Sequence, residues 1–203
     1  MSLIADYGFV LLILACAFGF FMAWGVGAND VANAMGTSVG SRALTIKQAI
    51  IVAMIFEFCG AYLAGGEVTE TIKNGIVDAE VISPDLMVLG MMSALLAAGT
   101  WLMIATMKGW PVSTTHSIIG AVIGFAAVGV STDAVHWEAI GPIVASWVVT
   151  PMLSGVVAFG LFMSVQKLII NTDHPFENAK RFVPLYMFLT GFMVALMTVT
   201  KGL

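Results

Sequence analysis

Residues 7–38 read YGFVLLILACAFGFFMAWGVGANDVANAMGTS, an apolar run that ends in a polar cluster. The run from Tyr7 to Ala28 lacks Asp, Glu, Lys, Arg and His, and about 20 apolar residues suffice to cross a bilayer as a helix. Asn29, Asp30 and Asn33 follow directly. Lipid strongly penalises such groups unless they are paired or line an ion site. The stretch therefore predicts a membrane helix that carries a functional site at its end.

The composition of the whole chain agrees with a membrane protein. Hydrophobic residues make up 60% of the sequence and charged residues 10%, with a mean hydropathy of +1.00, whereas soluble domains carry about 25% charged residues. Among Asp, Glu, Lys, Arg and His, only Glu57 and His116 lie inside the stretches long enough to span. These stretches are Tyr7–Ala28, Gln48–Gly66, Leu86–Met107, Gly109–Thr132, Ala139–Gln166 and Phe182–Thr200.

We therefore expect an all-α, polytopic protein of the cell (inner or plasma) membrane with about six hydrophobic segments. The lipid bilayer is its expected partner, and the lack of a basic patch excludes nucleic acid. The polar stretch 171–181 predicts a linker between a transport repeat, residues 1–170, and a final transmembrane helix, residues 182–203.

Two helix-breaking patterns interrupt the apolar segments. Gly25 and Gly27 lower the cost of unwinding and predict a broken first helix. Gly109 and Pro111 end a helix, and the hydroxyls that follow can cap a new one. The segment 109–130 is then either a spanning helix or a re-entrant helical hairpin, and the sequence leaves both open.

The first candidate site combines Asn29, Asp30 and Asn33. Backbone carbonyls of an unwound helix, together with carboxylate and amide oxygens, suit a hard cation such as Na⁺ or accept a proton. A polar contact between helices is the simpler alternative. Glu57, near the middle of the second span, is either a cation or proton site or a protonated side chain that bonds to another helix.

The second candidate site is Ser113-Thr114-Thr115, directly after Pro111. Hydroxyls and unpaired N–H groups at a helix start bind anions, helped by the helix dipole. Three adjacent hydroxyls without an arginine suit a tetrahedral oxyanion whose charge a bound cation offsets. An ordinary cap would need only one hydroxyl. His116 is either a proton relay or a neutral, packed side chain.

These patterns favour a transporter over an enzyme. The sequence contains no recognisable nucleophile–base pair, nucleotide-binding glycine loop or metal-ligand cluster, and no cofactor is expected beyond a coupling ion. Transport of another oxyanion such as sulfate remains open. So do a cation channel lined by Asp30 and Glu57 and a membrane subunit that does not transport.

Several motifs, in order along nearly the whole chain, resemble the inorganic phosphate transporter (PiT) family. They are Gly27-Ala-Asn-Asp-Val-Ala-Asn-Ala34, Gly36-Thr-Ser-Val-Gly-Ser41, Phe56-Glu57, Thr69-Glu-Thr-Ile-Lys-Asn-Gly-Ile-Val-Asp78 and Gly109-Trp-Pro-Val-Ser-Thr-Thr-His-Ser117. The resemblance implies a secondary transporter that moves inorganic phosphate together with Na⁺ or H⁺.

The resemblance also implies roles for the candidate residues. Ser113, Thr114, Thr115 and Asn29 would contact phosphate, and Asp30, Asn33 and Glu57 would serve cation binding or coupling, with Na⁺ held by Asn29, Asp30 and Glu57. Family members are typically about twice this length and carry two inverted copies of these motifs. The chain resembles the N-terminal half, so we expect a homodimer or a second-half repeat to complete the site.

Overall fold

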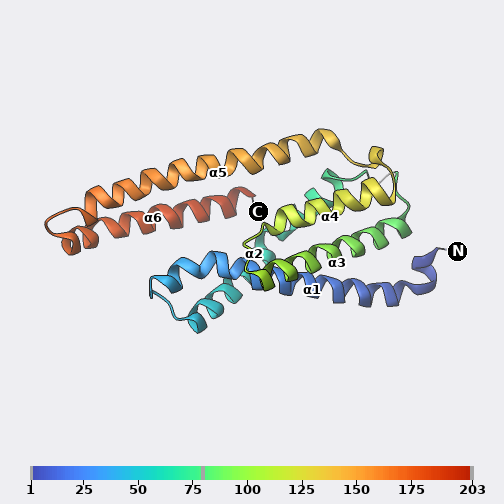
Figure 1. Ribbon diagram of the computed structural model, residues 1–203, viewed down its shortest axis with the longest axis horizontal. Helices are drawn as coiled ribbons and strands as arrows, with labels where there is room; N and C mark the ends of the chain where they lie inside the picture. Colours follow the sequence, from blue (N-terminus) through green and yellow to red (C-terminus); the bar gives the residue numbers. More distant parts are fainter. Residues whose placement is uncertain (1, 79–80, 202–203) are drawn as a thin grey trace. The chain divides into compact units, whose positions relative to one another are not determined.

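The computed structural model describes residues 2–78 and 81–201, and its regular elements in these ranges are helices (Figure 1). The α-helices are α1 (Leu3–Gly40), α2 (Ile46–Gly75), α3 (Pro84–Lys108), α4 (Thr114–Gly129), α5 (Trp137–Val165) and α6 (Pro175–Lys201). A 3₁₀ turn (Thr132–Ala134) precedes α5, and a π-helical turn (Gln166–Ile170) ends it. The all-α class predicted from the sequence is confirmed.

Five of these helices are long and apolar enough to cross a membrane, and α4 is shorter. Its 16 residues extend roughly 24 Å, less than the roughly 30 Å of hydrocarbon in a bilayer. The segment 109–130 contains this single unbroken helix, so no hairpin forms within it. The chain instead turns between α3 and α4, at the glycine and proline that the sequence marked.

The predicted break in the first helix is wrong. Within α1, only Tyr7 departs from helical backbone angles, near the N-terminal end. Gly25 serves helix packing instead of unwinding, because a Cβ atom there would lie 3.1 Å from the Cβ atom of Leu102 on α3. A glycine in an apolar helix can either make the backbone easier to unwind or let a neighbouring helix approach closely. At Gly25 the second effect applies, because Leu102 packs against it.

Two compact units make up the chain, Met1–Tyr62 with Val68–Trp137 and Leu63–Glu67 with Glu138–Leu203. In the first unit, α3 packs between α1 and α4 (Figure 1). Small residues allow this packing: a Cβ atom on Gly99 would lie 2.8 Å from the ring of Phe21 on α1, and one on Gly90 would overlap the ring of Phe125 on α4. An antiparallel bridge between buried Val77 and Val135 ties the chain after α2 to the chain before α5.

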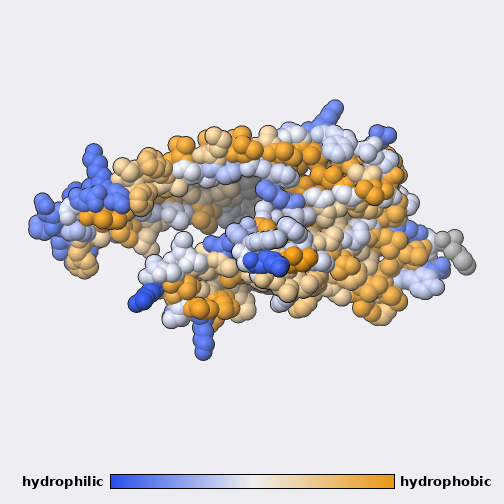
Figure 2. All heavy atoms as spheres, viewed as in Figure 1, coloured by the Kyte–Doolittle hydropathy of each residue, from blue (hydrophilic) through white to orange (hydrophobic). Residues whose placement is uncertain are grey.

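The second unit consists mainly of α5 and α6, which run antiparallel through a short turn (Figure 1). This turn covers only residues 171–174, because α6 begins at Pro175, within the stretch predicted as a linker. The division into repeat, linker and final helix remains a prediction. Hydrophilic side chains gather at this turn in Figure 2, while apolar side chains cover much of the helices' visible surface.

Candidate functional site

Asn29 is a buried polar side chain of the first unit, with 6% of its surface exposed. Its Nδ2 atom donates to the Trp110 carbonyl oxygen at 3.1 Å and to the Thr106 hydroxyl at 3.3 Å. Its Oδ1 atom accepts the Val112 backbone N–H at 3.3 Å and the Asn33 side-chain amide at 3.5 Å. A side-chain amide offers two donor hydrogens and two acceptor lone pairs, so all four positions of Asn29 are occupied.

The turn that Asn29 contacts, between α3 and α4, is formed by Gly109 and Pro111. Gly109 ends α3 in the left-handed region, with φ of 68°, where a side chain would be strained. The Gly109 N–H donates to the Thr106 carbonyl and the Trp110 N–H to the Ala105 carbonyl, which is the Schellman arrangement that satisfies the last carbonyls of a helix. Pro111 then prevents the helix from continuing.

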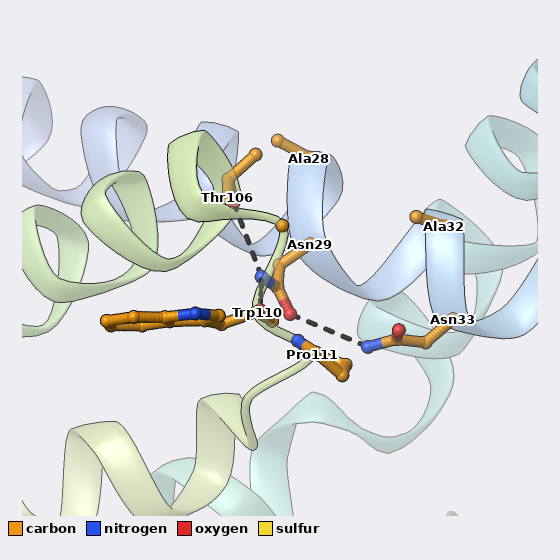
Figure 3. Close-up of a pocket in the computed structure, with 8 residues that line it drawn as sticks. Ala28, Asn29, Ala32, Asn33, Thr106, Trp110 and Pro111 are labelled. Atoms are coloured by element: carbon orange, nitrogen blue, oxygen red, sulfur yellow. Dashed lines mark hydrogen bonds between the residues drawn. The ribbon is translucent and has the colours of Figure 1, made fainter.

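Asn29 therefore pairs with the chain from 110 to 112 as a neighbouring strand would. Its amide bonds the carbonyl of Trp110 and the N–H of Val112 together, groups that share one edge of an extended chain. Figure 3 shows Asn29 projecting from α1 between Thr106 and the Trp110–Pro111 segment. This contact fixes where the chain emerges from α3 and where α4 begins.

The three hydroxyl residues at the start of α4 have different environments. Ser113 is the hydroxyl residue that caps α4, because its Oγ atom accepts the His116 backbone N–H at 3.2 Å. The Thr114 hydroxyl donates to the Asp30 carboxylate at 3.0 Å. The exposed Thr115 side chain makes no hydrogen bond to a described residue. Thr114 and Thr115 are the first two helical residues, whose backbone N–H groups have no acceptor within the helix.

A pocket of about 320 Å³ opens beside the Asn29 contact. Asn33 reaches toward Asn29 from one turn further along α1, and Pro111 lies opposite it (Figure 3). The lining residues are Ala28, Asn29, Ala32, Asn33, Thr106, Gly109, Trp110 and Pro111. The pocket combines small apolar surfaces with the polar groups of Asn29, Asn33 and Thr106.

The structure brings some of the predicted site residues together and leaves others apart. Asn29, Asn33, Asp30 and Thr114 are joined by hydrogen bonds around the start of α4. Glu57 is exposed on α2, and within the described residues it has no hydrogen bond to Asn29 or Asp30. The His116 side chain is exposed too. A cation site that includes Glu57 and a relay through His116 both remain predictions.

Sequence reasoning missed two contributors to this site, Thr106 and the backbone of residues 110–112. Thr106 supplies the hydroxyl that accepts from Asn29. Thr106 could have been recognised from the sequence as a candidate site residue, because it is a polar residue in the last turn of an apolar helix, three positions before Gly109. The carbonyl of Trp110 and the N–H of Val112 carry no such signal, since every non-proline residue has both groups.

Comparison with known proteins identifies the family. The sequence profile described as "Phosphate transporter family" matches residues 26–203. The chain belongs to the phosphate transporter family. Its similarity to a putative phosphate permease of Haemophilus influenzae reaches 54% identity over 205 residues, which cover 100% of this chain and 49% of that protein. The chloroplastic inorganic phosphate transporter 2-1 of Arabidopsis thaliana is 46% identical over 85% of this chain and 30% of its own length.

A solved structure described as "The sodium-dependent phosphate transporter" has the same fold. The TM-score is 0.79 and the identity 45%, over 84% of this chain and 42% of that one. The chain is an integral membrane protein of the plasma membrane, as predicted. It spans less than half the length of the two curated relatives, 49% of one and 30% of the other.

Proposed function

We propose that this chain forms one half of a secondary transporter that carries inorganic phosphate together with Na⁺. A second copy or a second repeat would supply the other half of the site. The family and the similarity to a solved transporter that is sodium-dependent support this choice of substrate and ion. Coverage of 49% of the Haemophilus influenzae relative and 42% of the solved transporter supports an incomplete site in the single chain.

One observation carries the proposal, the hydrogen bond from the Thr114 hydroxyl to the Asp30 carboxylate. A hydroxyl has a single donor hydrogen, so Thr114 cannot donate to Asp30 and to phosphate together. Na⁺ prefers oxygen ligands, as hard cations do, and Na⁺ at Asp30 would compete for the same carboxylate. Thr114 would then be released to donate to phosphate beside the α4 N-terminus.

This exchange of partners couples the two ligands. Without the cation, phosphate meets the negative charge of Asp30 and a hydroxyl whose donor is already used. With the cation, the charge is offset and the donor is available. Each ligand then raises the affinity for the other, as thermodynamic linkage requires. Rocking of the loaded or empty protein between inward and outward states would complete transport.

Uptake of radiolabelled phosphate into proteoliposomes tests the proposal. Vesicles contain either the purified chain or the full-length Haemophilus influenzae relative, and receive first a Na⁺ gradient and then a proton gradient. Saturable, Na⁺-driven uptake by either protein supports the proposal, and activity only in the relative shows that the chain needs a second repeat.

Three results would contradict it. Uptake driven only by a proton gradient would identify H⁺ instead of Na⁺ as the coupling ion. Stronger competition by sulfate than by unlabelled phosphate would identify sulfate as the preferred substrate. Non-saturable flux without coupling to a gradient would indicate a channel.

A further inference from the structure

We propose that Asn29 is a positioning residue, which holds the turn before α4 so that the α4 N-terminus faces Asp30, and that it does not itself bind phosphate. This inference rests on the proposed function. It revises the phosphate-binding role that the sequence predicted for Asn29.

The first argument is that the Asn29 amide has no capacity left. Both Nδ2 hydrogens are donated, to Trp110 and to Thr106, and Oδ1 accepts two N–H groups. Phosphate would need one of these donors. Releasing a donor at a site that is only 6% exposed would leave the former acceptor unpaired, and unpaired buried polar groups are costly. The half-buried Asp30 and the exposed Thr115 leave more room for a ligand.

The second argument is where the contact acts. Asn29 and Asp30 are adjacent on α1, and they hold the chain on either side of the Ser113 cap. Asn29 bonds the backbone of Val112, and Asp30 bonds the hydroxyl of Thr114. The start of α4 is therefore attached to α1 at two points. Loss of the hydrogen bond between Asn29 and Val112 would leave the N–H groups and hydroxyls at the start of α4 free to turn away from the proposed cation site at Asp30.

The third argument is chemical. The turn presents a carbonyl oxygen at Trp110 and an N–H at Val112, which require a donor and an acceptor on one side chain. Asparagine provides both within one planar group, whereas ionised aspartate only accepts. Asn29→Asp would therefore place two oxygens against each other at Trp110. A cation ligand would tolerate this replacement, because carboxylates bind hard cations well.

Hydrogen–deuterium exchange with single-residue resolution tests the contact directly, on the full chain in nanodiscs. In Asn29→Ala, we expect the Val112 amide to exchange at least about tenfold faster, because its acceptor is removed. The Trp110 amide is an internal control, since it bonds to Ala105 on α3 and should keep its rate. Asn33→Ala is the matched variant, because it removes an amide one turn away and should leave Val112 unchanged.

Equilibrium binding of inorganic phosphate in saturating Na⁺ tests the consequence. Asn29→Ala should weaken binding about tenfold, as expected for lost buried hydrogen bonds. In a chain that already carries Thr114→Ala and Thr115→Ala, the same change should weaken binding less than twofold, because it acts through those residues. Asn29→Asp should weaken Na⁺ binding as well.

The inference is overturned by unchanged exchange at Val112 in Asn29→Ala, by fully additive effects in the triple variant, or by retained Na⁺ affinity in Asn29→Asp. Exchange at Val112 needs no phosphate, so it judges the contact independently of the proposed function. Failure of the unaltered chain and of the full-length Haemophilus influenzae relative to bind phosphate would instead reject the proposed function.

Discussion

Helices α3 and α5 have closely similar mean hydropathy, but they differ in burial and in the use of polar groups. Within α3, 33% of an apolar stretch of 18 residues is buried inside the structure. In the corresponding stretch of Trp137–Ile170, which joins α5 to its π-helical turn, none of the residues is buried, and all of them are described. Thr106 on α3 accepts a hydrogen bond from another helix. Ser146 and Ser154 on α5 donate to carbonyls of their own helix. Hydropathy thus identifies both as membrane helices. Thr106 of α3 takes part in the Asn29 contact, whereas the interhelical side-chain bond described for α5, between Ser164 and Tyr186 of α6 at 2.7 Å, lies outside that site.

The glycines of α3 and α5 also differ in how closely they are packed. Gly90 of α3 lies directly under the Phe125 ring, and Gly99 admits Phe21 and the α1 backbone. Around Gly155 of α5, nothing described lies within 4 Å of an added Cβ atom. In lipid, where apolar side chains gain little by leaving their surroundings, close packing through small residues drives helix association. The first unit uses this device and α5 leaves it unused, so paired substitutions can test the comparison.

Replacing Asp30 with asparagine should have the largest effect. The carboxylate accepts the Thr114 hydroxyl and carries the charge proposed to hold Na⁺. The Asp30→Asn substitution keeps the size of the side chain and one acceptor oxygen but removes the charge. We expect Na⁺-driven phosphate uptake to fall on the order of a hundredfold, about 2.7 kcal/mol, measured as initial rates in proteoliposomes.

Glu177→Gln on α6 is the matched charge removal. Glu177 is exposed, and among the described residues its ion pair is with Lys180 on its own helix, at 3.5 Å. Such surface pairs contribute little, so the uptake rate should stay within twofold of the unaltered chain. Equal losses in both variants would remove the distinction between the first unit and α6.

Adding one methyl group at Gly90 should be the next largest effect. Gly90→Ala forces its Cβ atom into the space of the Phe125 ring, and overpacking of this kind costs typically about 1–3 kcal/mol. Gly155→Ala meets no described atom and improves helix propensity by up to about 1 kcal/mol. Chemical denaturation in mixed micelles should therefore shift in opposite directions. Destabilisation by Gly155→Ala as large as that by Gly90→Ala would reveal a neighbour of α5.

Removal of hydroxyls should have a smaller effect that is specific to phosphate. Thr114→Ala with Thr115→Ala should raise the phosphate concentration for half-maximal uptake about tenfold, because two donors near the helix start are lost. Ser146→Ala with Ser154→Ala removes two hydroxyls that bond within α5 and should leave this concentration unchanged. A normal half-saturation value in the threonine variant would reject the hydroxyl site.

The sequence predicted those parts of the site that depend on local chemistry. It predicted that Gly109 and Pro111 end a helix and that a hydroxyl after them can cap the next, because turn and cap preferences act within a few residues. The structure shows α3 ending at Gly109 and Ser113 as the cap of α4. The pairing of Asn29 with Asn33 follows from helical spacing. The all-α class required only composition and the lengths of the apolar runs.

The parts that failed depend on which surfaces meet. The sequence favours unwinding at Gly25, because it does not show Leu102 packed against that glycine. The grouping of Glu57 with Asp30 in one cation site, which the family resemblance implies, stays a prediction. The main partners of Asn29 are backbone groups 81 and 83 residues away. Because every non-proline residue carries the same backbone N–H and carbonyl groups, no sequence pattern could reveal these two partners.

The smallest predicted effect concerns two acidic residues in first turns of helices. Asp85 on α3 accepts the backbone N–H groups of Leu3 and Ile4 at 2.8 and 3.1 Å, so it caps a different helix, α1. Asp85→Asn keeps one acceptor but loses the charge that favours a helix N-terminus, worth about 0.3–1 kcal/mol. Glu177→Gln removes a first-turn charge of α6 that, among described residues, bonds only within its own helix. We expect Asp85→Asn to lower the free energy of unfolding by more than Glu177→Gln, measured by the same denaturation. The reverse order would mean that the charge of Asp85 adds nothing to the attachment of α1 to α3.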